Sequence, residues 1–570
     1  MGARVAPGAQ AVSATPGGPP EPTGGLSWFV VTSIVLRGGI IHSPADPFAE
    51  AILVDDGVVT WIGANDTADG LAARADRVIE LDGALVAPGF VDAHVHVVEE
   101  ALARSGVDLS AVTSRAAALE AIAERSRSHS AADGPLLAHG WDESQWDDSR
   151  PPTASELDTM TGGAAVYASR ADVHCAVVSS RLADEAGLRG LPGWREDGFV
   201  TGEAHVAARA VARALSPQAR DRLVEAGLRA AAARGVVSVH ENSAPGLDTR
   251  EGLASLLALT ASDDSGLPLV IGYRGELCRT ADEAREIASQ IPGLRGLAGD
   301  LNVDGSIGAR TAALRTPYAD APGHAGALSL DADQVRDHVL AVTEAGLQAG
   351  FHVIGDLAMD TALAGLAAAA ETARSAMRKI GHRLEHALLL DDAALQALVP
   401  LGVGLSMQPG FDAAWGGPGG LYEARLGNER AAGMNRLAAI ASAGIPTAFG
   451  SDAPVTPLHP WAAVRAAVFH HTADQRISAR AAFRSSTRGG WRLAGLDHTG
   501  AGEIRVGAPA HLAVWQAEQV TVQSEAAGLS SWSTDARSGT PLLPDLTDPA
   551  ATPTCVMTLR AGRAIYDTLG

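Results

Sequence analysis

The chain contains a single lysine, Lys379, among its 570 residues. A phosphate-binding loop of the GK[S/T] type needs a lysine after its glycines, so the sequence holds no such loop. A pyridoxal Schiff base would have to use Lys379 itself, and nothing around that residue favours this chemistry. The sequence also lacks a GxSxG motif and a GxGxxG motif after a strand, which argues against serine-hydrolase and Rossmann-type functions.

Cysteine is scarce as well, with Cys175, Cys278 and Cys555 far apart and without CxxC spacing. This usage is typical of a reducing, cytoplasmic setting and predicts neither a disulfide framework nor a zinc finger. No apolar run reaches the roughly 18–20 residues of a membrane helix. The first 26 residues are rich in Gly, Ala and Pro, with Arg4 as their only cation, so we expect 1–27 to be a flexible tail.

Positive charge is in the minority, with 44 basic against 66 acidic residues and a formal net charge of −22. Nucleic acids and anionic membranes bind basic faces, so neither is expected as a partner. A small-molecule substrate and a homo-oligomer are both compatible with this composition. Hydrophobic residues make up 46% of the chain, which predicts a substantial core.

The two ends of the chain share a strand-rich texture. Residues 28–86 contain short β-branched segments, and Asp55-Asp56-Gly57 between two of them predicts a hairpin. The texture returns in 505–570, so we expect one β-sandwich domain assembled from 28–86 and 505–570. Within the second segment, 519–553 is rich in Ser, Asp, Pro and Gly and predicts a long loop.

The middle of the chain, 87–504, alternates short apolar strands with Ala-rich helical patterns. Asp331 or Asp333 can cap one such helix, Gly346 can end it, and 347–354 then predicts a buried strand. Such repeats favour an α/β fold with a (β/α)₈ barrel over an open doubly wound sheet. We expect an insertion at about 100–230, over the barrel mouth. The expected strands are 89–96, 235–241, 268–274, 299–304, 348–354, 382–387, 403–408 and 446–451.

His94 and His96 stand two residues apart near the end of the first expected strand. The period of a strand puts both side chains on one face, with their Cα atoms about 6.6–6.8 Å apart, close enough to hold one ion. In a barrel the carboxyl ends of the strands face the active site.

Four further polar residues end later expected strands: His352, His386, Gln408 and Asp452. Each alone would more often cap a loop, but their shared placement would gather them at one face of the barrel. Imidazoles with a carboxylate suit zinc, manganese or iron, and an open coordination position would let the metal activate water.

Motifs along most of the chain resemble one family. The sequence resembles the metal-dependent amidohydrolase superfamily, most closely the family-3 or YtcJ-like branch, which includes N-substituted formamide deformylases. The resemblance covers about residues 32–566. It rests on PGFVDAHVH (88–96), GWDESQW (140–146), SRADVH (169–174), VDGSIGARTAALRTPYAD (303–320), FHVIGD (351–356), RLEHA (383–387), SMQP (406–409), GNER (427–430), GSDAPVTPLHP (450–460) and LRAGRAIYD (559–567).

The resemblance implies a (β/α)₈ barrel with a terminal β-sandwich, and a divalent metal site. The implied ligands are His94, His96, His352, His386 and Asp452. Many relatives also carry a carboxylated lysine on the fourth strand that bridges two metals. The matching position here is Asp300, which leaves two interpretations open. Asp300 could bridge two ions. Alternatively, His94, His96, His352 and Asp452 could hold one ion while His386 polarises the substrate carbonyl.

The implied activity is hydrolysis of a non-peptide, amide-type C–N bond, as in an N-acyl or N-formyl amine, by metal-activated water, most simply with zinc. Asp452 would carry the proton, with His386 as a second catalytic residue. Candidate substrate contacts are His174, Asp304, Arg310 and Gln408. The same barrel could instead run deamination, decarboxylation or isomerisation, or serve as a binding or scaffold protein that has lost catalysis.

Overall fold

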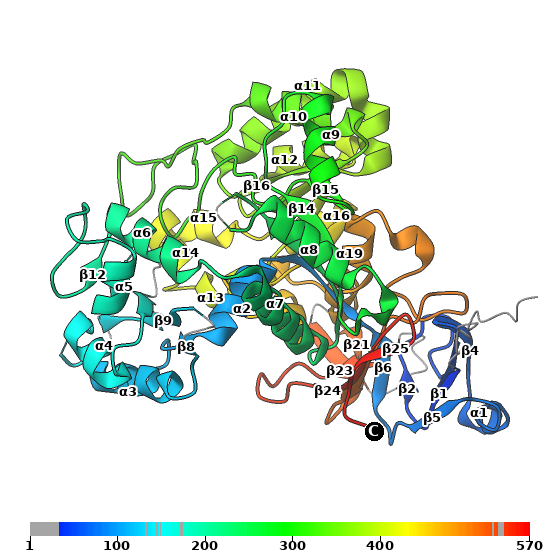
Figure 1. The fold of residues 1–570 in the computed structure, drawn as a ribbon. Coiled ribbons are helices and arrows are strands. Elements are labelled where there is room, and N and C mark those ends of the chain that lie inside the picture. Colours follow the sequence, from blue (N-terminus) through cyan, green and yellow to red (C-terminus); the bar gives the residue numbers. More distant parts are fainter. Residues whose placement is uncertain are drawn as a thin grey trace, which may run out of the picture. The chain divides into compact units, whose positions relative to one another are not determined.

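Eight parallel strands from the middle of the chain form a nearly closed barrel, and their order in the sheet follows the sequence (Figure 1). An isolated parallel pairing between Val95 and Ala453 brings the two edges of the sheet together. This computed structural model therefore confirms the predicted α/β barrel. The strands are β7 (Phe90–Val95), β13 (Val236–Ser243), β14 (Leu269–Arg274), β15 (Gly296–Leu297), β16 (Gln348–Val353), β17 (Arg383–His386), β18 (Gly404–Met407) and β19 (Thr447–Phe449).

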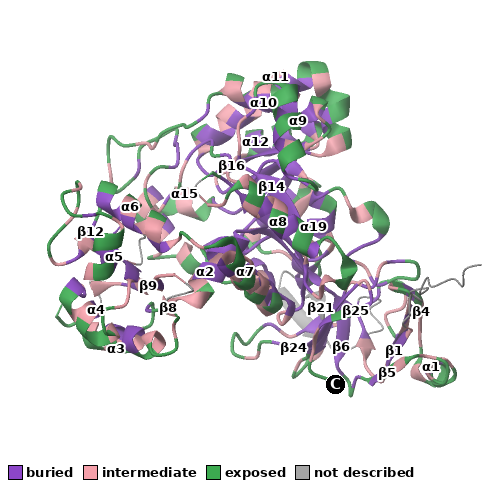
Figure 2. Cartoon of the chain, viewed as in Figure 1, coloured by how far each residue is buried: buried purple, intermediate pink, exposed green. Residues whose placement is uncertain are grey.

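Helices alternate with these strands along the chain, and their outer faces are exposed while the strands are buried (Figure 2). One or more helices lie between consecutive strands from β13 onward, and three follow β19. They are α8 (Arg250–Thr260), α9 (Ala281–Gln290), α10 (Ala332–Glu344), α11 (Asp356–Ile380), α12 (Asp392–Leu401), α13 (Pro409–Trp415), α14 (Leu421–Leu426), α15 (Asn428–Ala432), α16 (Leu437–Ser442), α17 (Pro460–Val468), α18 (Ala479–Ser485) and α19 (Arg488–Leu493).

The unit formed by α10 and β16 follows the sequence pattern closely. Asp331 caps α10 by accepting a hydrogen bond from the backbone N–H of Gln334, and the Gln334 side chain completes a capping box. Gly346 has a φ of 79°, a left-handed conformation that glycine adopts without steric cost and that ends the helix. Strand β16 begins two residues later.

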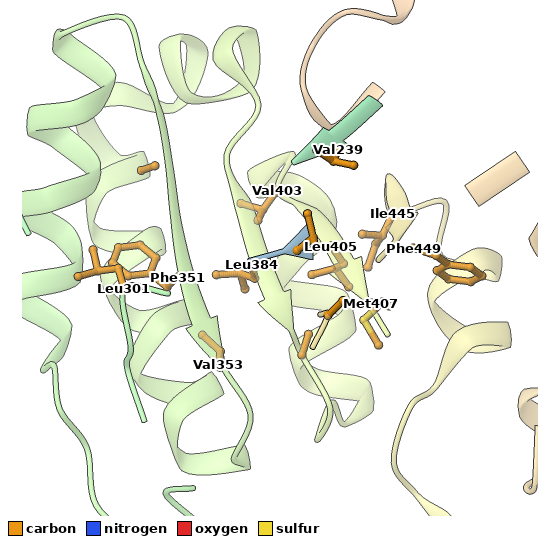
Figure 3. Close-up of a cluster of buried hydrophobic side chains, with 14 of the residues drawn as sticks. Val239, Leu301, Phe351, Val353, Leu384, Val403, Leu405, Met407, Ile445 and Phe449 are labelled. Carbon is orange, nitrogen blue, oxygen red and sulfur yellow. The ribbon is translucent and has the colours of Figure 1, made fainter. Parts of the chain in front are cut away.

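Alternate residues of the barrel strands face different surroundings. Phe351, Leu384 and Leu405, from three neighbouring strands, are buried in one hydrophobic cluster (Figure 3). Arg383 and Glu385 flank Leu384 on β17; they are also fully buried but pair with each other. The period of a strand thus separates a hydrophobic face from a polar one.

The fourth barrel strand differs from the prediction of 299–304. Strand β15 covers only Gly296–Leu297, and Gly299, with a φ of 86°, turns the chain out of the extended conformation. Asp300 follows this turn, and farther on Asn302 forms only an isolated pairing with His352. The prediction was wrong because a glycine at positive φ does not continue a strand.

Two sheets built largely from the chain ends pack against each other. Leu36 and Ile52 of one sheet share a hydrophobic cluster with Val514 and Leu559 of the other, which makes a β-sandwich. The first sheet has the order β4 (Val58–Gly63), β3 (Ala51–Asp55), β1 (Ile34–Arg37), β5 (Arg77–Glu80). The second has the order β2 (Ile40–Ile41), β6 (Leu85–Pro88), β20 (Leu512–Gln516), β24 (Thr554–Arg560), β25 (Arg563–Asp567).

The predicted hairpin joins β3 to β4, which are antiparallel. Asp56 and Gly57 both have positive φ, 48° and 75°, as a two-residue turn between twisted strands requires. Helix α1 (Asn65–Ala72) follows β4. The expected loop at 519–553 is wrong in part, because it contains a three-stranded sheet of β21 (Val520–Ala526), β22 (Leu529–Ser533) and β23 (Leu543–Pro544).

A separate five-stranded sheet lies between the first two barrel strands in the sequence. Helix α7 (Pro217–Ala232) already packs with the barrel, since Val224 and Leu228 share a cluster with Val236. The sheet therefore occupies a shorter stretch than 100–230. Its elements, after α2 (Val97–Ser105), are β8 (Val107–Asp108), α3 (Arg115–Ser126), β9 (Leu136–Trp141), α4 (Ala154–Thr161), β10 (Val166–Arg170), β11 (Ala176–Val178), α5 (Ser180–Glu185), β12 (Phe199–Val200) and α6 (Gly202–Ala212).

The structure describes residues 33–130, 134–143, 146–148, 150–170, 175–245, 247–526, 529–533 and 541–569. The predicted tail at 1–27 and the candidate substrate contact His174 lie outside these ranges. Within them, no helix is both long enough and apolar enough to cross a membrane.

Candidate metal centre

Five of the predicted ligands stand at or near the ends of barrel strands. His94 lies in β7, and His96 follows that strand directly as the residue before α2. His352 lies in β16, His386 ends β17, and Asp452 is the third residue after β19. His386 and Asp452 have φ values of 69° and 56°, an uncommon conformation for residues other than glycine that occurs often at functional sites.

The chain closes the barrel at this point. The backbone N–H of Asp452 donates to the carbonyl of His94 at 2.7 Å, and that of His96 donates to the carbonyl of Ala453 at 3.0 Å. These bonds hold the ends of the first and last strands together. They place Asp452 beside His94 and His96.

Asp300 reaches three of the imidazoles. Its Oδ2 lies 3.2 Å from Nε2 of His96, and its Oδ1 lies 3.5 Å from Nε2 of His94 and 3.9 Å from Nδ1 of His352. The short β15 makes this approach possible because the chain turns at Gly299, just before Asp300.

Asp452 lies close to two of the same histidines, His96 and His94. Its Oδ1 lies 3.1 Å from Nε2 of His96 and 3.5 Å from Nε2 of His94. Two sets of three groups have ligand atoms within 4.8 Å of one another: His94, His96 and Asp452 form one, and His94, Asp300 and His386 form the other. His94 belongs to both sets.

Each of the four histidines has one ring nitrogen held by an oxygen outside the cluster, which leaves its other nitrogen to face the cluster. Carbonyl and carboxylate oxygens only accept hydrogen bonds, so the held nitrogen carries the proton and the other offers a lone pair. The contacts are His94 Nδ1 to Glu385 Oε2 at 2.8 Å, His96 Nδ1 to Asn242 O at 3.1 Å, His352 Nε2 to Gly305 O at 3.2 Å and His386 Nδ1 to Gln408 Oε1 at 2.8 Å.

The atoms that face the cluster fit a divalent metal. Among the described residues, Nε2 of His94 and Oδ1 of both Asp300 and Asp452 are buried with no hydrogen-bond partner. Leaving three buried polar atoms unpaired is costly unless a bound group compensates them. Imidazole nitrogens and carboxylate oxygens are the donor types that zinc and related ions prefer.

A family model described as "Amidohydrolase family" matches residues 77–566. The chain belongs to the amidohydrolase family. It is 26% identical to YtcJ of Bacillus subtilis (strain 168) over 466 residues, which cover 78% of this chain and 84% of that protein. It is 24% identical to the N-substituted formamide deformylase of Arthrobacter pascens over 450 residues, covering 73% and 80%.

A solved structure, an uncharacterized metal-dependent hydrolase from Pyrococcus furiosus, superposes with a TM-score of 0.69 at 26% identity, covering 85% of this chain and 98% of that one. The match spans both the barrel and the sandwich, because neither alone would account for this coverage. It supports the same fold for this amidohydrolase over most of its length.

The electrostatics of the amidohydrolase cluster favour a cation. Burial alone would lower the pKa of His96, yet the carboxylates of Asp300 and Asp452 raise it well above its ordinary value. Burial would likewise raise the pKa of Asp300, but His96 and His94 hold it well below its usual range. His386 differs, because burial and the neighbouring imidazole of His352 lower its pKa to about 4, which keeps it neutral.

Two carboxylates beside the cluster were not among the predicted site residues. Glu385 contacts Nδ1 of His94. It stands two residues after Arg383 in the motif RLEHA, and the period of a strand places both side chains on one face. The motif therefore contained a signal for a charged pair beside the ligands. Asp92 accepts the backbone N–H groups of His94 at 3.2 Å and Ser451 at 2.9 Å, and so links the two ligand-bearing segments. Its place two residues before His94 was the corresponding signal.

The predicted substrate contacts have other partners in the structure. Gln408 holds His386. Both carboxylate oxygens of Asp304 accept backbone N–H groups, from Ala313, Ile354 and Gly355. Arg310 forms an ion pair with Asp320 at 2.7 Å and does not join the cluster.

Proposed function

We propose that this amidohydrolase is a metal-dependent hydrolase of a non-peptide, amide-type C–N bond in a small molecule, such as an N-acyl or N-formyl amine, and that its metal is zinc. The observation that carries the proposal is the set of four histidines, each with one ring nitrogen bonded to an oxygen outside the cluster and the other facing the cluster that Asp300 and Asp452 share. The similarity to an N-substituted formamide deformylase supports the choice of bond.

His94, His96 and Asp452 would hold one ion, and Asp300 with His386 and His352 a second, since both sets of ligand atoms converge around His94. A divalent ion bound there supplies Lewis acidity, which polarises a carbonyl group and lowers the pKa of water. The remaining chemistry belongs to side chains of the chain.

Asp452 is the group placed to move the proton. Its buried Oδ1 has no hydrogen-bond partner among the described residues. It would accept a proton from the water whose oxygen bonds to the carbonyl carbon. As the C–N bond breaks, Asp452 would return that proton to the leaving nitrogen, so that an acid and an amine are released.

The first test pairs metal analysis with a substrate screen. The purified protein should contain zinc, about two ions per chain if Asp300 bridges them, and should hydrolyse some N-formyl or N-acyl amines only with metal present. Negligible bound metal would instead favour a binding protein. Full metal content without hydrolysis of any amide would favour another reaction at the same site.

Asp452→Asn tests the proton carrier. The variant keeps the size of the side chain but cannot hold the proton, so kcat should fall about 10²- to 10⁴-fold. The matched control is Asp320→Asn, an exposed carboxylate that pairs with Arg310 and should leave kcat unchanged. Full activity of Asp452→Asn would show that another group moves the proton.

A further inference from the structure

His94 differs from the other three histidines in what holds it. Nδ1 of His94 contacts the carboxylate of Glu385 at 2.8 Å, whereas His96, His352 and His386 are held by neutral carbonyl oxygens. His94 is also the ligand shared by both converging sets. Of the four histidines, the one that both sets share is therefore also the one whose outward ring nitrogen contacts a charged group.

Glu385 is itself fixed by a guanidinium. Nε of Arg383 donates to Oε1 of Glu385 at 2.5 Å, and Nη2 donates to Oε2 at 2.8 Å. Nη2 also donates to the carbonyl of Ala93 at 2.7 Å, and the guanidinium carbon lies 4.4 Å from the centre of the Tyr273 ring. Arg383, Glu385 and His94 are all 0% exposed. A two-pronged contact of this kind fixes both the position and the plane of the carboxylate.

This arrangement decides which nitrogen of His94 carries the proton. An arginine stays charged inside a protein, so both oxygens of Glu385 act as acceptors. Nδ1 of His94 must then donate, and its Nε2 offers a lone pair to the cluster. A carboxylate partner also makes the imidazole a stronger ligand than a neutral carbonyl does.

Stability alone does not account for the pair. A buried ion pair costs so much desolvation that apolar residues of similar volume are often as stable or more stable. Arg383 and Glu385 stand on β17, the strand that ends with His386. Their contacts reach β7, where Glu385 bonds to the ring of the shared ligand His94.

We propose that Arg383 and Glu385 are positioning residues that set the tautomer and the donor strength of His94 as a metal ligand. The inference rests on the proposed metal-dependent function. It adds that tight metal binding requires the negative charge of Glu385, although Glu385 does not itself bind the metal.

The experiment measures zinc affinity by competition with a chromophoric chelator, in the absence of substrate. Glu385→Gln keeps the shape of the side chain and removes its charge, so zinc affinity should fall about 10- to 100-fold. Arg383→Met/Glu385→Gln removes both charges and should show the same loss. The double variant is needed because Glu385→Gln alone leaves a buried guanidinium without its partner, which destabilises the fold.

Arg560→Met is the control for destabilisation by itself. Arg560 is buried on β24, where its guanidinium donates to the carbonyl of Leu267 at 3.0 Å and pairs with Asp263 at 3.1 Å, and it contacts none of the ligands. This variant should lose stability and keep the zinc affinity of the wild type.

Zinc binding by the double variant as tight as that of the wild type would overturn the inference, and so would an equal loss of affinity in Arg560→Met. Both results would leave the proposed function standing. A wild-type protein that binds no divalent metal would overturn the proposed function, and the inference with it.

Discussion

Asp300 is the side chain on which the number of metal ions depends. Its carboxylate contacts three imidazoles, at 3.2 Å from His96, 3.5 Å from His94 and 3.9 Å from His352. If two ions are bound, Asp300 would be a ligand of both. Asp300 thus has the contacts that the bridging interpretation needs, although its side chain is shorter than the carboxylated lysine of many relatives.

If Asp300 bridges two ions, Asp300→Asn should reduce the metal content from two ions per chain to one. The amide keeps the volume of the side chain but is a weaker ligand, so kcat/KM should fall at least about 10-fold. Elemental analysis and hydrolysis assays measure the two effects, with Asp320→Asn as the control. A metal content unchanged by the substitution would mean that Asp300 does not bind the metal.

His338 links the pH dependence of stability to one barrel strand. Nδ1 of His338 accepts the backbone N–H of Cys278, and Nε2 donates to the carbonyl of Leu297 in β15, both at 3.0 Å. Burial lowers the pKa of His338 to about 4. The folded protein therefore holds this histidine neutral, while the unfolded chain protonates it near pH 6.5.

The unfolding free energy should fall as the pH drops from about 6.5 to 4, because the unfolded state then binds the additional proton. His338 accounts for up to about 3 kcal/mol of this fall, at about 1.4 kcal/mol per pH unit. His338→Gln should be less stable at pH 7 but show a shallower slope in urea unfolding at several pH values. Parallel slopes for the two proteins would exclude His338 as a source.

At the scale of an element, the turn after β15 positions Asp300. Gly299 has a φ of 86°, and a Cβ atom there would lie 2.6 Å from Oδ1 of Asn242. Gly346, which ends α10, has a similar φ of 79° but no atom within 4 Å of its added Cβ. Both glycines have the left-handed backbone that strains any other residue, and only Gly299 also has a close neighbouring side chain.

Gly299→Ala should therefore destabilise the protein more than Gly346→Ala does. Gly346→Ala should cost about 1–2 kcal/mol from the left-handed conformation alone. Gly299→Ala should cost more and also lower the metal content, because the turn that carries Asp300 must shift. Thermal unfolding and elemental analysis measure both effects; equal losses in the two variants would contradict a special role for the β15 turn.

The same element shows where sequence reasoning reaches its limit. Strands such as β16 and β17 were predicted within a few residues because apolar residues and glycines bound them clearly. For β15, the apolar residues Leu301 and Val303 favour a longer strand than the structure has. The strand ends early because Gly299 has a positive φ, which the residue type does not reveal. The segment 519–553 was misjudged because its Ser, Asp, Pro and Gly content outweighed short runs such as Val520-Thr521-Val522, whose β-branched residues favour strands.

The convergence of His94, His96, His386 and Asp452 could be predicted because each stands at or near the end of a recognisable strand, whereas Asp300 was singled out only through the family resemblance. What holds the ligands could not be predicted, because the acceptors of His96 and His352 are the backbone carbonyls of Asn242 and Gly305. Every residue has such a carbonyl, so residue type carries no signal for it. Arg310 shows a similar limit, because it was a candidate substrate contact and the sequence gives no sign that Asp320 pairs with it.

At the scale of the molecule, the metal centre joins parts of the chain that are far apart in sequence. His94 lies on the first strand of the barrel and Asp452 is the third residue after the last strand, and their backbones already form a hydrogen bond at 2.7 Å. Asp300, His352 and His386 add strands between them. A metal bound to these ligands would therefore cross-link the closure of the barrel to its opposite side.

Metal removal should lower the Tm of the whole barrel. A ligand that binds only the folded state stabilises it by RT ln(1 + [L]/Kd), about 4 kcal/mol at a thousandfold excess over Kd. The stabilisation by metal should shrink as the pH falls, because protons compete with the metal for the ligand nitrogens. His94 binds its proton tightly, since Asp452, Asp300 and Glu385 raise its pKa to about 10 despite burial. Calorimetry with and without a chelator, at pH 6 and pH 8, should show the larger difference at pH 8. An equal difference at both pH values would mean that His94 is not a ligand, since binding to it must release the competing proton.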